Sequence, residues 1–324
     1  MRAWNGGAYD TRRDRLVIWG GGHGDYGGNE VYVFDVRRLR WERLTEPSAT
    51  TRCSGRLNEE AGQTEYRING DGTPVAHHTY DGIEYVPSVD KLFVKGTSIW
   101  PIGGKNSYTW FFDFNRLSWT RKAELPDPNP AIAVSAYDPF TGNVYYHNVT
   151  SLFEYDPLAD TWHRRGVFRG WLAPGRTGEL DPIDRKFYIV GSGAVWYYDL
   201  KEEGVLKPKR LPTAGDRKIE DVFAPGLAYD IASGRLVAWA GTTKRRGGAK
   251  GWIPADIGDT VYALDPRTGV WTKHPPAGPV APPKRAAVYN HGTYGRWRYI
   301  PSKDVFIGVN SVHGNVYFYR LPYR

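Results

Sequence analysis

The sequence contains one cysteine, Cys53, and one methionine among its 324 residues. A single cysteine excludes an intramolecular disulfide and a cysteine-rich zinc module, although it does not fix the compartment. No apolar run approaches the roughly 20 residues of a membrane-spanning helix, so we expect no insertion into a membrane. The first ten residues, MRAWNGGAYD, hold no hydrophobic segment that could act as a secretory signal. The charged fraction of 24% and the hydrophobic fraction of 40% fit a globular protein with a core of its own.

Glycine, proline and aromatic residues are abundant instead. The chain has 38 Gly, 23 Pro, 13 Trp and 22 Tyr, and aromatic residues make up 15% of it. Such a mixture favours short strands that pack through large rings and are joined by tight turns. The formal net charge of +8 has two interpretations. It indicates either an anionic partner (an acidic polysaccharide, a nucleic acid or a membrane surface) or a solvated arginine-rich surface.

A hairpin pattern recurs six times along the chain. In each copy an apolar residue is followed seven positions later by a second one, with turn-forming residues such as DPFTGN or DIASGR between them. An apolar anchor, a polar turn and a second apolar anchor predict a β-hairpin whose ends are buried. The six pairs are Tyr9 and Leu16, Tyr85 and Leu92, Tyr137 and Val144, Leu180 and Phe187, Tyr229 and Leu236, and Tyr299 and Phe306.

A second pattern follows each hairpin. Strand-like segments appear as EVYVFD, YTWFFD, SLFEYD, AVWYYD, TVYALD and NVYFYR, and in four copies a Trp stands six residues after the final Asp. The four pairs are Asp35 and Trp41, Asp113 and Trp119, Asp156 and Trp162, and Asp265 and Trp271. The fourth copy keeps the spacing with Val205 after Asp199. Similarity at a period near 50 residues predicts a β-propeller, because each four-stranded sheet needs neighbours to bury its faces.

The strand-ending Asp, the Trp six residues later and the glycine run Gly20 to Gly22 resemble Kelch repeats and the propeller of galactose oxidase. The resemblance spans essentially the whole chain and implies a single all-β domain, a six-bladed Kelch-type propeller. It implies no particular activity, because propellers serve as enzymes, sugar binders and protein scaffolds alike. Related bacterial propellers are often exported, which favours a periplasmic or extracellular location if an upstream segment is missing.

We assign the blades to residues 1–48, 75–126, 131–168, 171–212, 221–276 and 284–324. The position six residues beyond Arg320 falls past the last residue, so the sixth blade is expected to lack its outer strand. Ring propellers often borrow that strand from the N-terminus. Either the natural protein continues upstream and supplies it, which we favour, or the ring closes on a three-stranded blade.

Propeller topology places the long insertions on one face. Loops between second and third strands share a face with the connections between blades, and the longest insertions belong to these two classes. They are residues 20–30, 46–74, 97–107 and 242–259. Loops carried by a rigid scaffold commonly bind ligands, so we expect the binding site on this face.

Polar residues recur where inner strands begin. The positions eight residues before the hairpin anchors of blades 2, 3, 5 and 6 hold His77, Asn129, Asp221 and His291, which we expect to ring the mouth of the central channel. His23 and His313 lie in loops of the same face, so these two, His291 and either His77 or His78 are expected to converge. Histidine is the usual acid–base group near neutral pH and a common metal ligand. The alternative is that each is an ordinary polar loop residue.

Other candidates lie nearby. The run GGGHGDYGG is followed by a strand and not by a helix, so it is not a phosphate-binding loop, and its glycines instead present His23, Asp25 and Tyr26. Arg176 on the inner strand of blade 4 would bind a carboxylate or sulfate, or form a structural salt bridge. Tyr80 and Tyr289 are candidates for sugar stacking or proton transfer. The basic loop 244–250 is interpreted as solvated, because nothing in the chain resembles a nucleic-acid-binding module.

Binding of a carbohydrate-like, anionic ligand by a monomer is the first functional hypothesis, and no cofactor is assigned. The second is a polysaccharide lyase or hydrolase, in which Arg176 neutralises a uronate, His78 or His291 is the base and Tyr80 the acid. Protein scaffolding ranks lower, since no adaptor domain accompanies the propeller. A copper-radical oxidase ranks lower too: Cys53 would have to crosslink a Tyr, and that family takes one histidine from an additional C-terminal domain.

Overall fold

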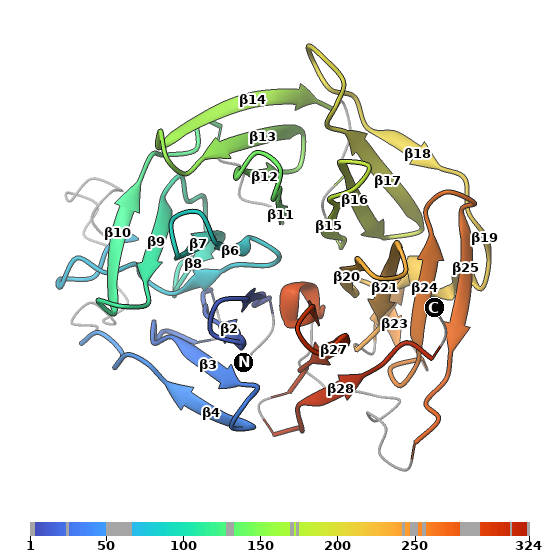
Figure 1. Ribbon diagram of the computed structural model, residues 1–324. Helices are drawn as coiled ribbons and strands as arrows, with labels where there is room; N and C mark the ends of the chain where they lie inside the picture. Colours follow the sequence, from blue (N-terminus) through green and yellow to red (C-terminus); the bar gives the residue numbers. More distant parts are fainter. Residues whose placement is uncertain are drawn as a thin grey trace.

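The computed structural model describes residues 4–23, 26–49, 67–127, 133–168, 172, 175–241, 244–246, 252–254, 257–278, 292–311 and 313–322. Six small antiparallel sheets stand around a central axis like the blades of a propeller (Figure 1). The inner strands of the six sheets contact one another in chain order, and the last contacts the first, so the ring is closed. The prediction of an all-β, six-bladed propeller is confirmed.

Blades 1 to 5 each contain four radial strands. These are β1 (Gly7–Asp10), β2 (Arg15–Ile18), β3 (Tyr32–Asp35) and β4 (Arg40–Arg43); β6 (Ile83–Val86), β7 (Lys91–Lys95), β9 (Thr109–Asp113) and β10 (Ser118–Lys122); β11 (Val134–Tyr137), β12 (Val144–His147), β13 (Ser151–Asp156) and β14 (Thr161–Val167); β15 (Thr177–Asp181), β16 (Lys186–Gly191), β17 (Ala194–Asp199) and β18 (Lys209–Leu211); and β20 (Gly226–Asp230), β21 (Arg235–Trp239), β24 (Val261–Asp265) and β25 (Val270–His274).

Blade 6 has three strands in the described part of the chain, as the sequence predicted. They are β26 (Trp297–Ile300), β27 (Val305–Gly308) and β28 (Tyr317–Tyr319). Short elements decorate the ring: the ribbon of β5 (His77–His78) and β8 (Thr97–Ile99), the ribbon of β22 (Lys244–Arg246) and β23 (Trp252–Pro254), β19 (Ala214–Gly215) parallel to β25, and the 3-10 turns η2 (Arg217–Asp221) and η4 (Tyr294–Arg296). Within the described ranges, no helix combines the length and the apolar character needed to cross a membrane.

The hairpin spacing found in the sequence sets the register of every blade. In all six blades the two anchor residues are directly opposite each other across the first two strands, as Tyr9 is opposite Leu16. In blade 2 the turn holds Asp90 in the left-handed region at φ 53°, where its carboxylate accepts a hydrogen bond of 2.8 Å from the Tyr85 hydroxyl. Asp tolerates this backbone conformation better than most residues, which explains its place in the turn.

The Asp that ends the third strand caps the next turn. In blade 1 the Asp35 carboxylate accepts hydrogen bonds of 2.9 Å from the backbone N–H groups of both Arg37 and Arg38. This side chain satisfies two donors that the turn would otherwise leave unpaired. The chain then reverses into the outer strand, where Trp41 lies opposite Phe34.

Blade 4 departs from the predicted spacing. Val205 does not belong to the outer strand; it is 70% exposed and precedes β18, which begins at Lys209. Leu206 is the buried residue at this point of the chain instead. Its backbone N–H donates to the Arg165 carbonyl of blade 3 at 2.7 Å. The connection between third and fourth strands is therefore longer here than in the other blades.

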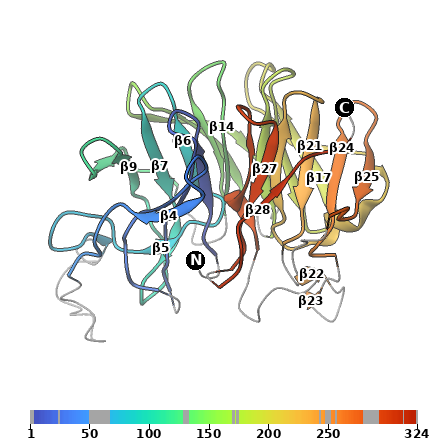
Figure 2. The same ribbon diagram turned by 60° about the horizontal axis from the view of Figure 1, so that its bottom comes forward.

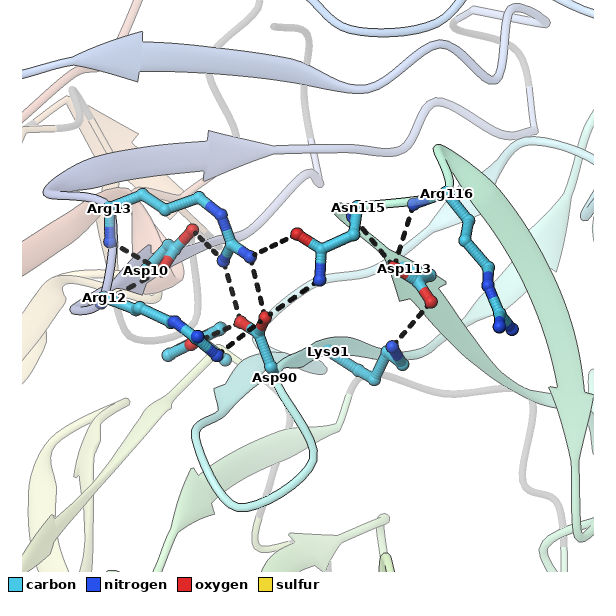
Figure 3. Close-up of polar contacts among 9 residues, drawn as sticks. Asp10, Arg12, Arg13, Asp90, Lys91, Asp113, Asn115 and Arg116 are labelled. Atoms are coloured by element: carbon cyan, nitrogen blue, oxygen red, sulfur yellow. Dashed lines mark hydrogen bonds and ion pairs between the residues drawn. The ribbon is translucent and has the colours of Figure 1, made fainter.

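The two faces of the ring differ. In Figure 2 the ribbons β5 and β22–β23 lie on the same side as the N-terminus, while the hairpin turns lie on the opposite side. We call the first side the loop face and the second the turn face. Between blades 1 and 2, ion pairs join the turns of the turn face (Figure 3). Arg13 binds Asp90 through two hydrogen bonds of 2.8 and 2.7 Å and also contacts Asp10.

Candidate functional site

A ring of backbone surrounds the axis just before the inner strands begin. In each blade where it is described, the residue five positions before the first hairpin anchor has a positive φ. These residues are Trp4, Tyr80, Gly175, Ala224 and Tyr294. Four of the five are not glycine, and the left-handed conformation costs such residues about 1–2 kcal/mol each. Strain of this kind is concentrated at functional sites, which makes the ring the first place to look for one.

Hydrogen bonds run from blade to blade around this axial ring. The Tyr80 N–H donates to the Trp4 carbonyl at 2.7 Å, and the Ala224 N–H donates to the Gly175 carbonyl at 2.8 Å. The Tyr294 N–H donates to the Ala224 carbonyl at 3.3 Å. At Tyr80, Ala224 and Tyr294 the left-handed backbone thus turns the N–H towards the preceding blade, so contacts between blades offset the local strain at these three positions.

Aromatic side chains of the axial ring meet at the axis. The Tyr80 ring centroid lies 5.8 Å from that of Trp4 and 6.0 Å from that of Tyr294, and Phe223 lies 5.7 Å from Trp4. Tyr294, Tyr80 and Phe223 are buried, and Trp4 is half-buried. These edge-to-face contacts join the four rings into one aromatic group, in which Trp4 is the most exposed member.

His78 and Tyr80 form the polar side of this arrangement. His78 Nδ1 lies 3.3 Å from the Tyr80 hydroxyl, which lies 3.3 Å from Ser98 Oγ. The His78 ring also packs 5.9 Å from Trp4 and 6.2 Å from the exposed His23. Two histidines, a tyrosine, a serine and a tryptophan therefore meet beside the axis on the loop face. The set offers a stacking surface and groups that can donate and accept hydrogen bonds.

The β5–β8 ribbon positions His78. The sequence predicted that His77 and His78 enter the innermost strand of blade 2, but that strand, β6, begins at Ile83. His77 and His78 instead pair with β8 because the 97–107 insertion folds back over them. A Cβ at Gly96 would lie 2.3 Å from the His78 carbonyl, so only glycine permits this close approach.

His77 points away from the axial ring. Its ring packs 4.9 Å from Trp19, and its Nδ1 lies 2.9 Å from the Val75 carbonyl. Burial lowers the pKa of His77 to about 3, so this side chain is neutral at physiological pH. The pairing with β8 shifts register between His77 and His78, and the two side chains lie in different surroundings: His78 beside Trp4 at the axis and His77 beside Trp19 in the core.

The other predicted site residues in the described ranges make contacts of their own. Arg176 is buried and donates to the carbonyl of Gly191 at 3.0 Å and to the carbonyl of Leu172. Asp221 ends η2 and is half-buried, and His313 is exposed with its N–H donating to Ser311 Oγ at 3.1 Å. The hydroxyl of the exposed Tyr26 donates to Glu30. Four predicted residues lie outside the described part of the chain, namely Asp25, Asn129, Tyr289 and His291.

Acidic residues and one arginine fill the axis next to the aromatic ring. Arg298 of β26 lies 3.5 Å from a Glu84 oxygen and 3.7 Å from a Glu179 oxygen. The Asp81 carboxylate accepts the Gly178 N–H of blade 4 at 2.7 Å, and Ser135 of blade 3 donates to Glu84 at 2.9 Å. We call these residues the axial charge cluster; it ties blades 2, 3, 4 and 6 together across the axis.

Three carboxyls share one guanidinium in this cluster, and burial decides their protonation. Burial raises the pKa of Asp81 and of Glu84, and it raises the pKa of Glu179 to about 7. Burial acts against the charged form of Arg298, but the carboxylates of Glu84, Glu179 and Asp81 outweigh it and raise the pKa of Arg298. The cluster therefore holds protons near neutral pH.

We predict that Glu179→Gln stabilises the protein increasingly as pH rises above about 4.5. The raised pKa of Glu179 means that its protonated form is favoured in the folded state, so the wild type loses stability as pH rises from about 4.5 through about 7. At pH 8 the variant should be more stable by about 3 kcal/mol, and at pH 4.5 nearly equal to the wild type. Urea unfolding at both pH values measures this. An equal difference at both would contradict it, and Glu202→Gln at an exposed ion pair is the control.

Metal chemistry finds no support among the described side chains. No group of three or more His, Cys, Asp and Glu residues in those ranges is placed to hold a metal ion. Cys53 lies outside the described residues, and so does any crosslink between Cys53 and a tyrosine of the kind that a copper-radical oxidase needs.

Sequence reasoning missed Trp4, Ser98, Phe223 and Tyr294. Trp4, Tyr80 and Tyr294 are the fifth residues before a hairpin anchor, and Phe223 precedes the residue at that position in blade 5, Ala224. The same anchors that revealed the repeat thus mark these positions.

Comparisons with known proteins support the fold and leave the function open. No family model matches the chain, and no curated protein matches it either. Solved structures do: a structural-genomics protein of unknown function from Bacteroides thetaiotaomicron aligns with a TM-score of 0.59 over 98% of this chain and 70% of that chain. The two are 11% identical, so the similarity shows the fold alone. The chain thus has the architecture of a six-bladed β-propeller, a class defined by shape and not by activity.

Proposed function

We propose that this protein is a Kelch-type propeller that binds a carbohydrate-like ligand at the loop face of the axis, where Trp4, His23 and His78 meet. The observation that carries the proposal is the hydrogen-bonded chain of His78, Tyr80 and Ser98 beside the half-buried Trp4 ring. Sugars present an apolar ring face and a rim of hydroxyls. An indole beside hydroxyl and imidazole groups suits both parts, since convergent polar groups next to an aromatic wall give orientation and contact area.

The groups that a ligand reaches first are His23 and Trp4. His23 is exposed and its backbone N–H donates to the Ser98 carbonyl at 3.0 Å, so the loop that carries it is anchored to β8. His78 and Tyr80 lie beneath and are buried. A ligand can contact His23 and Trp4 at the surface, whereas acid–base chemistry at Tyr80 needs access to a hydroxyl on a residue that is only 6% exposed. This difference favours binding over catalysis.

We predict that Trp4→Ala weakens sugar binding by at least about tenfold, which corresponds to about 1.4 kcal/mol. The loss follows from removing the stacking surface. Isothermal titration with a panel of neutral and uronate-containing oligosaccharides measures it, and the uronate members test for an anionic ligand. Trp41→Ala is the matched control, because Trp41 is a partly exposed tryptophan on the outer strand of blade 1. Binding that survives both Trp4→Ala and His23→Ala, or a panel without any binding member, would sink the proposal.

The His78–Tyr80 hydrogen bond keeps a lyase or hydrolase as the second candidate. A base and an acid in contact are what elimination beside a uronate needs. In this candidate Arg176 is the cation that neutralises the uronate. Its guanidinium already donates to backbone carbonyls of its own blade, which weighs against the candidate. The same oligosaccharide panel, assayed for unsaturated uronate and for new reducing ends, separates the two. Turnover lost in Tyr80→Phe with affinity retained would establish the enzyme; affinity without product supports the binder.

A further inference from the structure

The hairpin turns of the turn face carry large apolar side chains at exposed positions. Turns are usually occupied by Gly, Pro, Asn, Asp and Ser, because these residues fit the turn backbone or hydrogen-bond to it. Here six large apolar side chains in the turns are between 46% and 78% exposed. Among the described residues, Val205 is the only other large apolar side chain that is more than half exposed. The six turn residues are Leu39, Leu117, Phe140, Leu158, Ile183 and Ile231.

These apolar side chains come from five different blades. Three are in the turns between first and second strands, in blades 3, 4 and 5, and three are in the turns between third and fourth strands, in blades 1, 2 and 3. Both kinds of turn lie at the same end of an antiparallel sheet. The side chains therefore project from one face of the ring, the face opposite to the ribbons β5 and β22–β23 (Figure 2).

The exposed charge on the same turns has one sign. Outside the long connection of blade 4, every acidic residue of these turns is buried or half-buried, whereas six basic residues are exposed. The connection of blade 4 exposes two lysines and one glutamate, Lys201, Lys207 and Glu203. The six basic residues are Arg12, Arg37, Arg38, Arg116, Arg267 and Lys303.

The ion pairs of the turns explain this asymmetry. The Asp14 side chain is 12% exposed, whereas its partner Arg37 is 65% exposed. Asp90 is likewise 12% exposed, and Arg12 beside it is 67% exposed. In Figure 3 the Arg116 side chain extends away from the ion pairs. Each pair thus keeps its carboxylate within the turn and presents its guanidinium to the surroundings, so the turn face complements a negatively charged surface.

Apolar and basic residues are interleaved on this face, and this indicates the kind of partner. Leu39 stands between Arg38 and Arg40, and Leu117 directly follows Arg116. A protein interface has an apolar centre and a polar rim, and a soluble polyanion has no use for exposed apolar side chains. A lipid bilayer, by contrast, accepts apolar side chains one by one at the boundary of its headgroups, and anionic lipids attract basic residues.

We propose that the turn face binds the surface of an anionic lipid bilayer. The apolar side chains of the turns enter the headgroup region, and the exposed arginines donate paired hydrogen bonds to lipid phosphates. The contact is peripheral, because only turns reach the lipid. The loop face, with Trp4, His23 and His78, then faces away from the membrane, where a ligand in solution reaches it. The formal charge of +8 is thereby explained by an anionic partner.

Co-sedimentation of the intact protein with vesicles tests this proposal. We expect binding to vesicles of equal parts of phosphatidylcholine and phosphatidylglycerol, weakening as salt is added, and no binding to phosphatidylcholine alone. The double variant Phe140→Ser, Ile183→Ser should lower the partition coefficient by at least about tenfold, and so should Arg37→Gln, Arg38→Gln. In the wild type, backbone amides around Phe140 and Ile183 should exchange hydrogen more slowly when vesicles are bound.

Two double variants away from the turns are the matched controls. Ile102→Ser, Val167→Ser removes apolar side chains that are 38% and 48% exposed, in the insertion of the loop face and at the end of β14 that lies away from the turns. Arg164→Gln, Arg210→Gln removes exposed charges from the outer strands β14 and β18. Both should bind vesicles as the wild type does. Because all the altered side chains are exposed, every variant should also keep the thermal unfolding midpoint of the wild type.

Four results would overturn the proposal. The protein fails to sediment with anionic vesicles at low salt, or the control variants lose as much binding as the turn variants. Binding that is lost with the arginine pair and unchanged with the apolar pair would assign the face to a soluble polyanion. Self-association without lipid that Phe140→Ser, Ile183→Ser abolishes would assign it to a second copy of this chain. Sugar binding through Trp4 is measured separately on the other face, so either proposal can fail without the other.

Discussion

Replacing Arg298 with Met should destabilise the protein by about 3–5 kcal/mol at pH 8, the largest effect that we expect of any single substitution. Arg298 is buried and is the partner of both Glu84 and Glu179. It also donates to the Gly7 carbonyl of blade 1 and to the Ile83 carbonyl of blade 2. Its loss leaves acidic groups buried without their cation and removes hydrogen bonds that hold blades 1, 2 and 6 together at the axis.

The pH dependence of this destabilisation separates the contribution of the Arg298 charge from that of its packing. Because burial already raises the pKa values of Asp81, Glu84 and Glu179, these carboxyls take up protons readily once Arg298 is gone. The destabilisation should therefore be smaller at pH 5 than at pH 8, and Glu179→Gln should restore part of the lost stability at pH 8. Denaturant unfolding of the single and double variants measures both effects. A loss that is the same at both pH values and unrelieved in the double variant would show that Arg298 acts through packing alone.

Asp90→Asn should cost about 3 kcal/mol at neutral pH, the second-largest effect. Asp90 lies at the centre of the contacts drawn in Figure 3, where it binds Arg13 through two hydrogen bonds, Arg12 at 3.1 Å and Asn115 at 3.3 Å. Hydrogen bonding from Arg13 holds the pKa of Asp90 well below its usual range, although burial opposes it. Asn fits the same left-handed turn, so the substitution removes the charge and little else.

The effect of Asp90→Asn on stability depends on pH in the opposite sense to that of Glu179→Gln. A carboxyl whose pKa is lowered by folding contributes stability above its unfolded pKa of about 3.8 and loses it as pH falls further. The difference between Asp90→Asn and the wild type should thus shrink below pH 3. Asp14→Asn is the control at the same turn position of blade 1: its partner Arg37 is 65% exposed, and such a pair contributes less than about 1 kcal/mol. Equal losses at Asp14 and Asp90 would contradict the account.

The sequence predicted the fold in detail because the anchors of a hairpin are a local property. A spacing of seven residues, set by one turn type, recurred in six places, and in all six the anchors lie directly opposite each other. The Asp-to-Trp spacing was right in four blades and wrong for Val205, where Leu206 instead makes the contact with blade 3. That contact depends on a neighbouring blade, and a spacing rule within one blade contains no such information.

The site was harder to predict because it depends on which face of a short ribbon each side chain occupies. His78 and Tyr80 do come together, and His23 lies beside them. His77, one residue away, belongs to the core against Trp19, and the pairing with β8 shifts register between the two histidines. Arg176 was expected to bind a carboxylate or sulfate or to form a salt bridge, but its guanidinium donates to carbonyls of blade 4, a role that charge and spacing do not distinguish from ligand binding.

The contact between blades 6 and 1 has a consequence for how the chain folds. Arg298 reaches the Gly7 carbonyl across 291 positions of sequence, whereas the other neighbouring blades are joined by consecutive segments. The entropy lost on closing a loop grows with the logarithm of its length, so this closure is the most costly of the six. Blades can form one after another along the chain, each against its predecessor, but the ring exists only once its two ends have met. We therefore expect the blades to form locally first and the β26–β1 contact to form last.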